Sequence, residues 1–281
     1  MKNKKLNISY MICATPRTGS FLLCDALSNT KIAGTPKEYL SKRNLLKWQE
    51  NQNLEDYIQS IFNQSASSNR VRGIKTMLKQ FNELREKARK NPDYKNIILN
   101  DMHHYLPNTR YIFITRRDKI RQAISYERAI QTSKWRLKEN EQYKPKKVIF
   151  NLFGIDKNIN IIKHDEDAWK SYFKKNKIRP LVIVYEDFIE NQDKTIIQVL
   201  KFLSIPIPKN LEIKKSNFVK QSDKETDLWI QRYKERRFSD KLLSSYLIIK
   251  STLLWPLYLL SAKIKIKSEN YTKLINWIKN G

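Results

Sequence analysis

Acidic residues and glycine are scarce in this chain, which has only 5 Gly among its 281 residues. Its 28 Asp and Glu are outnumbered by 55 Lys and Arg, giving a formal net charge of +27. Such a charge favours anionic partners, including nucleotides, acidic lipids, charged glycans and nucleic acids. The abundance of Lys, Asn and Ile also fits a biased codon usage. The charge alone therefore does not define a function.

Cysteine is nearly absent. Cys13 and Cys24 are too few for a disulfide scaffold and lack the spacing of metal ligands, so we expect two buried, reduced thiols and no metal site. The basic start, Met1 to Lys5, is followed by an interrupted apolar segment without a small-residue cleavage site. This pattern indicates a first core strand rather than a signal peptide, and it predicts a cytoplasmic protein.

The tripeptide Gly-Lys-Ser/Thr is also missing, which argues against the phosphate loop of nucleoside triphosphatases. The first apolar run ends instead in a short polar loop, after which an apolar helical pattern begins. A loop between a strand and a helix N-terminus can bind a phosphate through backbone N–H groups, and Arg17 adds a full charge. The loop is Thr15-Pro16-Arg17-Thr18-Gly19-Ser20.

Strand-like runs alternate with helical patterns along the chain. This alternation predicts an α/β, P-loop-like three-layer fold, with a central, mainly parallel sheet and helices on both faces. We expect a domain over residues 1–237, with 138–163 as an insertion or loose lid. We expect a C-terminal amphipathic helical extension over 238–281. The predicted strands are Leu6–Thr15, Gly73–Met77, Arg110–Thr115 and Pro180–Tyr185.

A second anion site is expected after the strand that ends at Thr115. Arg116 and Arg117 follow it directly, and the hydroxyl of Ser125 on the next helix can reach the same anion. Two such sites on neighbouring strands suit a nucleotide with phosphates at both ends of its ribose, which describes 3′-phosphoadenosine 5′-phosphosulfate (PAPS). Surface ion pairing of the two arginines with acids such as Asp118 is an equal alternative.

These pieces resemble the Stf0-type bacterial sulfotransferases, the family of the trehalose 2-sulfotransferases that also includes nodulation-factor and lipopolysaccharide sulfotransferases. The matching motifs keep the family's order between about Ile8 and Arg236. They are Thr15–Ser20 with Leu22-Leu23, Gly34–Tyr39, Gly73–Lys75, Arg116–Asp118, Gln122–Ser125, Arg128-Ala129, Gln131-Thr132, Trp135, Tyr185–Asp187, Lys220–Asp223, Trp229 and Arg232-Tyr233.

The resemblance implies a role for each matching residue in sulfuryl transfer from PAPS to a hydroxyl of a carbohydrate or glycolipid. Glu38 would be the general base, which takes the proton of the attacking hydroxyl. The 5′-phosphosulfate would be bound by Arg17, Thr18, Gly19 and Ser20. The 3′-phosphate would be bound by Ser125 and by Arg116 or Arg117, and a loop with Gln221 and Asp223 would close over the nucleotide. The acceptor would lie against Thr35, Pro36, Lys37, Tyr39 and Lys75.

Several residues allow more than one interpretation. Lys75 could contact acceptor or nucleotide, or simply end its strand. A catalytic role for His103 or His104 is the weaker alternative, since no partner carboxylate is identifiable. Trp135 and Trp229 are expected to pack rather than to bind sugar. The trehalose enzymes carry Gln at the positions of Pro16 and Ser41, which argues against trehalose as the acceptor.

The remaining expectations concern partners. The Lys-flanked apolar stretch Tyr246–Leu260 is too short for a confident membrane span, but it suits peripheral contact with the inner membrane. Packing of the extension on the core or on a second subunit is the alternative, and the family suggests a homodimer. Two rival functions are a basic nucleic-acid-binding protein and a kinase-like phosphoryl transferase. We expect no nucleic-acid partner, because the cations are spread along the chain and no nucleic-acid motif appears.

Overall fold

The structure of the protein is a computed structural model, and it describes residues 8–46, 48, 53–98, 102–106, 108–137, 146–214, 216 and 224–249. The chain divides into two compact units, residues 1–226 and 227–281. The first unit contains the sheet and the helices packed on it. Helix α9 (Lys224–Ile249) begins at the end of the first unit and continues in the second.

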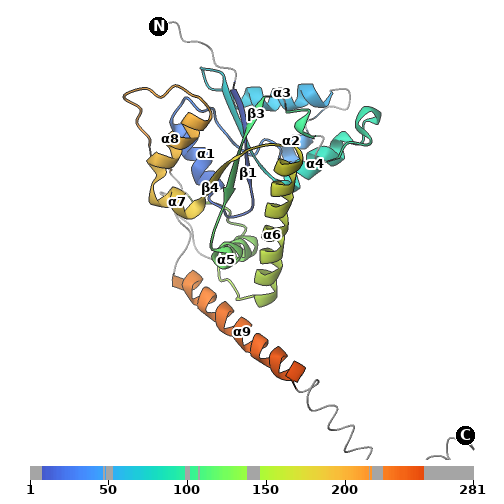
Figure 1. The fold of residues 1–281 in the computed structure, drawn as a ribbon, viewed down its shortest axis with the longest axis vertical. Helices are drawn as coiled ribbons and strands as arrows, with labels where there is room; N and C mark the ends of the chain where they lie inside the picture. Colours follow the sequence, from blue (N-terminus) through green and yellow to red (C-terminus); the bar gives the residue numbers. More distant parts are fainter. Residues whose placement is uncertain are drawn as a thin grey trace, which may run out of the picture. The chain divides into compact units, whose positions relative to one another are not determined.

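Four parallel strands form the sheet in the order β2-β1-β3-β4 (Figure 1). The strands are β1 (Ile8–Ala14), β2 (Val71–Met77), β3 (Thr109–Thr115) and β4 (Leu181–Val184). Ile12 in the central strand is paired with Lys75 on one side and with Ile112 on the other. The predicted α/β fold with a parallel sheet is confirmed.

Helices cover both faces of the sheet, because the strands alternate their buried side chains between the two faces. Tyr10, Ile12 and Ala14 pack with α1, α7 and α8, whereas Met11 and Cys13 pack with α2, α3, α4 and α6 (Figure 1). The helices of the first face are α1 (Ser20–Asn29), α7 (Tyr185–Glu190) and α8 (Gln192–Phe202). Those of the second are α2 (Lys42–Leu45), α3 (Leu54–Gln64), α4 (Leu78–Ala88) and α6 (Leu152–Lys175).

Gly73 in β2 allows the ring of Tyr10 to cross the neighbouring strand. Tyr10 is completely buried, and its hydroxyl donates a hydrogen bond to the carbonyl of Ala33 at 2.6 Å. A Cβ on residue 73 would lie 2.2 Å from Cζ of Tyr10. The glycine is therefore required by this close approach.

We expect Gly73→Ala to lower the free energy of unfolding by about 1–3 kcal/mol, the usual cost of overpacking a core. Urea denaturation followed by circular dichroism measures this loss. Tyr10→Leu removes the ring. In that background, adding Gly73→Ala should leave the free energy of unfolding nearly unchanged. An equal cost of the alanine in both backgrounds would contradict the steric explanation.

The topology determines where a ligand can bind. After β1 the chain forms α1 and then β2, which pairs with one side of β1. Later in the chain, β3 pairs with the other side of β1. In open parallel sheets, ligands bind beyond the carboxyl ends of the strands at such a switch point. The crevice at the ends of β1 and β3 is bordered by the loop after Ala14 and by α5 (Lys119–Thr132).

Helix α6 corrects one sequence-based expectation. Residues 138–163 were expected to form an insertion or loose lid, but α6 begins at Leu152, and its side chains at Ile155 and Ile162 are completely buried. The lid prediction is wrong for residues 152–163, because apolar residues at helical spacing hold this segment against the core. Residues 138–145 lie outside the described part.

Little of the predicted C-terminal extension can be compared with the structure. Helix α9 is described to Ile249, so most of Tyr246–Leu260 lies outside the described residues. None of the described helices is long and apolar enough to cross a bilayer. The boundary at residues 237/238, the peripheral membrane contact and the homodimer stay predictions.

Candidate functional site

The loop after β1 is a tight turn that ends at the N-terminus of α1. Arg17 and Gly19 both have a left-handed backbone, with φ of 65° and 74°. A Cβ on residue 19 would lie only 2.4 Å from Cδ2 of Tyr185, so no larger residue fits there. The Thr18 hydroxyl donates to the carbonyl of Thr15 at 3.0 Å, inside the turn. This geometry directs the backbone N–H groups that begin α1 toward one point.

Gln122 on α5 connects the loop after β1 to the helix that follows β3. Its side chain is completely buried, and Nε2 donates to Thr15 Oγ1 at 3.0 Å and to the carbonyl of Pro16 at 2.7 Å. Asp118, the N-cap of α5, accepts from the backbone N–H of Arg121 at 2.9 Å. The loop and the start of α5 are thus held together as one site.

Arg17 joins the two anion sites that the sequence predicted. Its backbone lies in the loop, whereas its Nε donates to Ser125 Oγ on α5 at 2.9 Å. Its Nη1 donates to the carbonyl of Trp135, in the segment that follows α5. The structure therefore brings Arg17 and Ser125 together at the ends of β1 and β3.

Arg116 is the second cation of the site. Its Nη1 donates to the carbonyl of Arg17 at 3.3 Å, and its guanidinium lies 4.6 Å from the centre of the Tyr185 ring. Its Nε is buried and has no hydrogen-bond partner within the described part of the chain, since Glu186 Oε1 is 3.7 Å away. A buried N–H without a partner is costly, so this group is suited to receive an anionic oxygen.

Arg117 points elsewhere. Its side chain is exposed and forms an ion pair with Asp187, at the start of α7. Glu186 accepts from the backbone N–H groups of Arg117 at 2.9 Å and Asp118 at 3.2 Å, and so holds the turn between β3 and α5. Of the two arginines, Arg116 faces the loop and Arg117 pairs on the surface.

Burial perturbs both cations of the site. Burial and, as a smaller effect, the nearby charge of Arg116 together lower the pKa of Arg17 to about 10. Burial also lowers the pKa of Arg116, against the opposing effect of Tyr185 and Glu186. Two positive charges are thus held close together where water solvates them poorly. A bound anion would relieve both penalties.

We expect sulfate to raise the thermal midpoint of the protein. At roughly ten times its dissociation constant, it should add about 1.4 kcal/mol of stability, which corresponds to about 3–5 °C. Differential scanning fluorimetry in sodium sulfate, against sodium chloride at equal ionic strength, measures the shift. Arg116→Met should abolish it, and an equal shift in that variant would contradict the assignment.

Glu38 and Lys75 form an ion pair close to the loop. Lys75 on β2 is completely buried, and its ammonium donates to Glu38, whose side chain is 28% exposed. The Lys75 Nζ also lies 3.7 Å from the centre of the Phe21 ring, in the first turn of α1. Lys75 therefore fixes the position of Glu38, while part of the Glu38 side chain remains open to solvent.

The other predicted acceptor residues surround Glu38 in the sequence but face different ways. Thr35 donates its backbone N–H to Ser65 at 2.8 Å, and its hydroxyl lies 3.3 Å from that of Tyr39. Pro36 is buried, whereas the Lys37 side chain is exposed. The carbonyl of Lys37 accepts from the backbone N–H of Lys75 at 2.9 Å, which ties this loop to β2.

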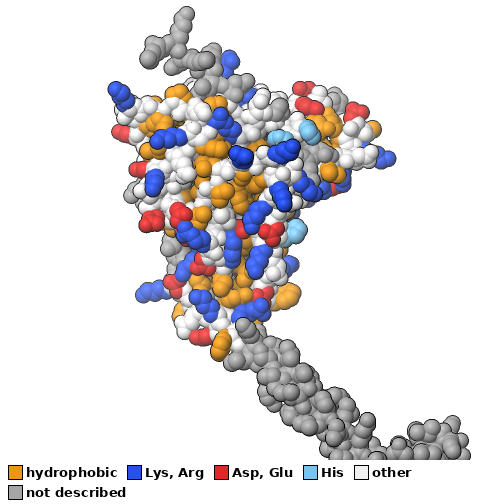
Figure 2. Space-filling model, in the orientation of Figure 1, with side chains coloured by type: hydrophobic (Ala, Val, Ile, Leu, Met, Phe, Trp, Pro, Cys, Tyr) orange, Lys and Arg blue, Asp and Glu red, His pale blue; other side chains and the backbone are white. Residues whose placement is uncertain are grey.

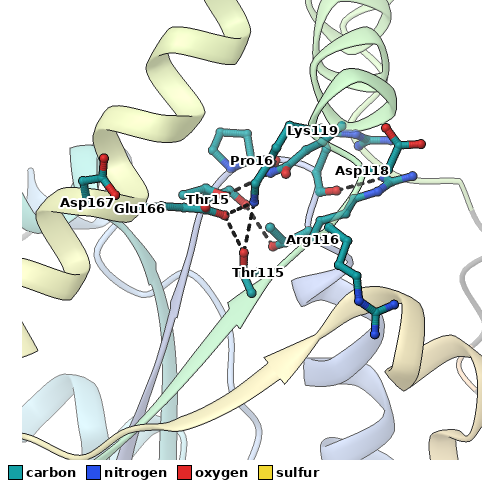
Figure 3. A network of polar contacts seen from close by, with 12 residues as sticks. Thr15, Pro16, Thr115, Arg116, Asp118, Lys119, Glu166 and Asp167 are labelled. Atoms are coloured by element: carbon teal, nitrogen blue, oxygen red, sulfur yellow. Dashed lines mark hydrogen bonds and ion pairs between the residues drawn. The ribbon is translucent and has the colours of Figure 1, made fainter. Parts of the chain in front are cut away.

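A second network supports the site from behind (Figure 3). Glu166 on α6 is 5% exposed, and its Oε1 accepts from Thr115 at 2.6 Å and from Lys119 at 2.5 Å. Trp169, one turn further on α6, donates to the carbonyl of Ala14 at 3.3 Å. Helix α6 thus connects the ends of β1 and β3 to the start of α5.

Sequence reasoning gave no role to several of these supporting residues. Tyr185, Glu186 and Gln122 were noted as parts of matching motifs, but their contacts depend on segments more than 60 residues apart in the chain. Glu166 carries no sequence signal beyond being an acid on an amphipathic helix. Gln221 and Asp223, predicted to close over the nucleotide, lie outside the described residues.

Other residues singled out from the sequence include His103, the two cysteines and Trp135. His103 Nδ1 is 3.1 Å from the hydroxyl of Tyr111, which lies near the start of β3 and therefore toward the amino ends of the strands, away from the loop. Both cysteines are free and buried, and burial raises the pKa of Cys24 to about 12. Trp135 is 44% exposed, with its ring centre 5.9 Å from that of Tyr126.

The donor groups present suit a phosphorylated or sulfated ligand. They comprise loop N–H groups, a serine hydroxyl and two arginines, of which Arg116 has a buried Nε without a hydrogen-bond partner among the described residues. Arginine and backbone N–H groups are the usual partners of such oxyanions. Among the residues that the structure describes, no three His, Cys, Asp or Glu side chains gather as metal ligands would.

Comparison with known proteins shows the family of this chain. Residues 9–236 match the family described as Stf0 sulphotransferase. The trehalose 2-sulfotransferase of Mycolicibacterium smegmatis is 25% identical over 269 residues, covering 83% of this chain and 97% of the relative. That of Mycobacterium tuberculosis is 24% identical over 259 residues, covering 80% and 94%. A solved sulfotransferase domain from the curacin biosynthetic pathway has a TM-score of 0.41 at 15% identity, covering 74% of this chain and 77% of its own. The chain belongs to the Stf0 sulphotransferase family.

Proposed function

We propose that this sulfotransferase moves a sulfuryl group from PAPS to a hydroxyl of a carbohydrate or glycolipid, with Glu38 as general base. One observation carries the proposal. A phosphate-type loop and the buried Arg116, whose Nε has no hydrogen-bond partner within the described residues, lie at the ends of β1 and β3, and Lys75, which holds the Glu38 carboxylate, packs on Phe21 in the helix that follows the loop. The names of the two trehalose 2-sulfotransferases support a sugar as the acceptor.

The two ends of the nucleotide would bind to different parts of the site. The N–H groups of Thr18, Gly19 and Ser20 would hold the 5′-phosphosulfate at the N-terminus of α1, where the helix dipole favours an anion. Ser125 and Arg116 would hold the 3′-phosphate. Arg17 would contribute to both ends, because it spans from the loop to Ser125. We assign the 3′-phosphate to Arg116 and not to Arg117, whose guanidinium pairs with Asp187.

PAPS supplies an activated sulfuryl group whose leaving group is the nucleotide phosphate. The chain's own task is to orient the attacking hydroxyl and to take its proton. Glu38 is suited to that task, because part of its side chain is exposed while Lys75 holds its carboxylate in place. Arg17 and the loop N–H groups would offset the charge that builds on the leaving oxygen, as fixed donors do in other transfer enzymes.

The acceptor differs from trehalose in this proposal. Pro16 stands where the trehalose enzymes of the family carry a glutamine, and Ser41 stands in place of another. Pro16 has no side-chain donor, and its carbonyl is already bonded to Gln122. The loop that suits the donor nucleotide therefore lacks one polar group for a disaccharide.

The nucleic-acid alternative has little support from the surface. Figure 2 shows Lys and Arg side chains scattered over the visible face, with Asp and Glu between them, rather than gathered into one stripe. A phosphoryl transferase is disfavoured by the loop itself, which lacks the Gly-Lys-Ser/Thr that cradles a nucleoside triphosphate.

Radiolabel transfer tests the proposed reaction. The protein is incubated with [³⁵S]PAPS and a mixture of glycans and glycolipids, and with [γ-³²P]ATP in a parallel reaction. We expect ³⁵S, and not ³²P, to appear in a carbohydrate product, with release of an equal amount of 3′-phosphoadenosine 5′-phosphate. Transfer of ³²P alone would overturn the proposal.

A further inference from the structure

Lys75, which holds Glu38 in place, carries its charge in a fully buried position. Within the described part of the chain, its Nζ has one hydrogen-bond acceptor, the Glu38 carboxylate. Nζ also lies 3.7 Å from the centre of the Phe21 ring. An ammonium over an aromatic ring is attracted by the negative face of the ring, and most strongly where water is excluded. The Phe21 ring is therefore the second group that stabilises the charge of Lys75.

Phe21 lies at the beginning of α1. It directly follows Ser20, the first residue of the helix. Its backbone thus belongs to the turn whose N–H groups are proposed to hold the 5′-phosphosulfate. Its ring, in contrast, contacts Lys75 on β2. One residue therefore connects the proposed donor site with the lysine that positions the proposed base.

The ion pair also lies close to the next turn of α1. Cys24 follows Phe21 by three residues and thus lies on the same side of the helix. Burial raises the pKa of the Cys24 thiol to about 12, while the charge of Lys75 opposes this rise and that of Glu38 adds to it. Both charges of the pair therefore act on this side of α1.

A third element contacts the Phe21 ring. The guanidinium of Arg136, in the segment after α5, lies 5.1 Å from the centre of the ring. The carbonyl of the preceding residue, Trp135, accepts from Arg17 in the loop. The ring is therefore held between β2 and the segment after α5, while its backbone lies in the first turn of α1.

We propose that Phe21 is a positioning residue for sulfuryl transfer, which acts through Lys75 to set the distance between the Glu38 carboxylate and the first turn of α1. This inference rests on the proposed function, because it takes Glu38 as the base and this turn as the site of the 5′-phosphosulfate. In the reaction, the hydroxyl oxygen forms a bond to sulfur, the bond from sulfur to the phosphate oxygen breaks, and the hydroxyl proton goes to Glu38. The attacking oxygen must reach both the carboxylate and the sulfur, so a displacement of about 1 Å lowers the rate about 100-fold.

Two substitutions separate the aromatic face from the bulk of the side chain. Phe21→Leu keeps an apolar side chain without the face, whereas Phe21→Tyr keeps the face. Transfer of ³⁵S is measured with saturating [³⁵S]PAPS over a dilution series of the glycan and glycolipid mixture, which separates the maximal rate from half-saturation. We expect Phe21→Leu to lower the maximal rate about 10- to 100-fold and to change half-saturation less than about threefold, and Phe21→Tyr to keep at least about a third of the rate. A wild-type rate in Phe21→Leu, or an equal loss in both variants, would overturn the proposal.

A double-mutant cycle with Lys75→Met tests whether the ring acts through the lysine. In the Lys75→Met background there is no ammonium for the ring to hold, so adding Phe21→Leu should lower the maximal rate by less than about twofold. An equal loss in the wild-type and Lys75→Met backgrounds would mean that Phe21 only packs in the first turn of α1, and the proposal would be wrong.

Nucleotide binding distinguishes failure here from failure of the proposed function. Calorimetry with 3′-phosphoadenosine 5′-phosphate should give affinities within about threefold for the wild type and for Phe21→Leu, because the ring acts on the base and not on the nucleotide. Loss of nucleotide binding in Phe21→Leu, with an active wild type, would overturn this inference alone. Absence of ³⁵S transfer by the wild type would overturn the proposed function, and this inference with it.

Discussion

Glu38→Gln is expected to lower kcat by about 10²–10⁴-fold while leaving the affinity for 3′-phosphoadenosine 5′-phosphate unchanged. The amide keeps the shape of the side chain but cannot accept the proton of the attacking hydroxyl, and general bases contribute about this much. Steady-state transfer of ³⁵S measures kcat, and calorimetry measures nucleotide affinity. Glu83→Gln is the matched control, because Glu83 lies near a lysine and its side chain is 31% exposed, against 28% for Glu38.

The same substitution leaves Lys75 buried without its counter-charge. Breaking a fully buried ion pair costs about 3–5 kcal/mol, and the partial exposure of Glu38 reduces this to roughly 2–3 kcal/mol. If Glu38→Gln folds poorly, Glu38→Gln with Lys75→Met removes both charges and should recover the fold without recovering activity. Near wild-type turnover in either variant would assign the base to another residue.

Arg116→Met should weaken the binding of 3′-phosphoadenosine 5′-phosphate by about 30- to 4000-fold, whereas Arg117→Met should change it by less than about threefold. The buried Arg116 would pair with the 3′-phosphate, and truncating one member of such a buried pair costs about 2–5 kcal/mol. Arg117 is solvent-exposed and bonded to Asp187, and exposed ion pairs contribute little. Calorimetry of both variants provides the test.

Adenosine 5′-phosphate serves as the ligand control for this pair. It lacks the 3′-phosphate, so Arg116→Met should weaken its binding much less than that of the bisphosphate. Equal losses for both ligands would place Arg116 at the 5′ end. A larger loss in Arg117→Met than in Arg116→Met would reverse the assignment.

The parallel α/β sheet was predictable from the sequence, because strand-like runs alternate with helical patterns along the chain. Leu6–Thr15 and Arg110–Thr115 predicted β1 and β3 to within two residues. The sequence also singled out the loop and Ser125 as ligand-binding residues, a role that stays a prediction, and Arg17 of the loop donates a hydrogen bond to Ser125. What local sequence could not provide was the direction of side chains, which depends on segments far apart in the chain.

The pair Arg116 and Arg117 illustrates this limit. Two adjacent arginines look equivalent in sequence, but successive side chains leaving a strand point to opposite sides. Arg116 packs against Tyr185, and Arg117 forms an ion pair with Asp187. Tyr185 and Asp187 both belong to α7. The start of α7 determines which arginine can reach the ligand, and it lies about 70 residues away in the chain.

Helix α6 shows a different limit. Residues 138–163 contain six Lys and four Asn, a composition that suggested a loose surface segment. The apolar residues of 152–163 nevertheless fall at helical spacing, and Glu127 on α5 accepts from Asn151 at 3.1 Å and from Asn158 at 3.0 Å. Polar side chains whose sequence suggests a solvent-exposed surface thus form hydrogen bonds between α5 and α6.

The central claim is that the loop, Arg116 and Ser125 bind a nucleotide with phosphates at both ends of its ribose. Isothermal titration calorimetry of the wild type with 3′-phosphoadenosine 5′-phosphate, ATP and single-stranded DNA tests it most directly, with Arg17→Met and Ser125→Ala as variants. The account predicts binding of the bisphosphate at least about 100-fold tighter than ATP, and its loss in Arg17→Met. Equal or tighter binding of ATP or DNA would contradict it.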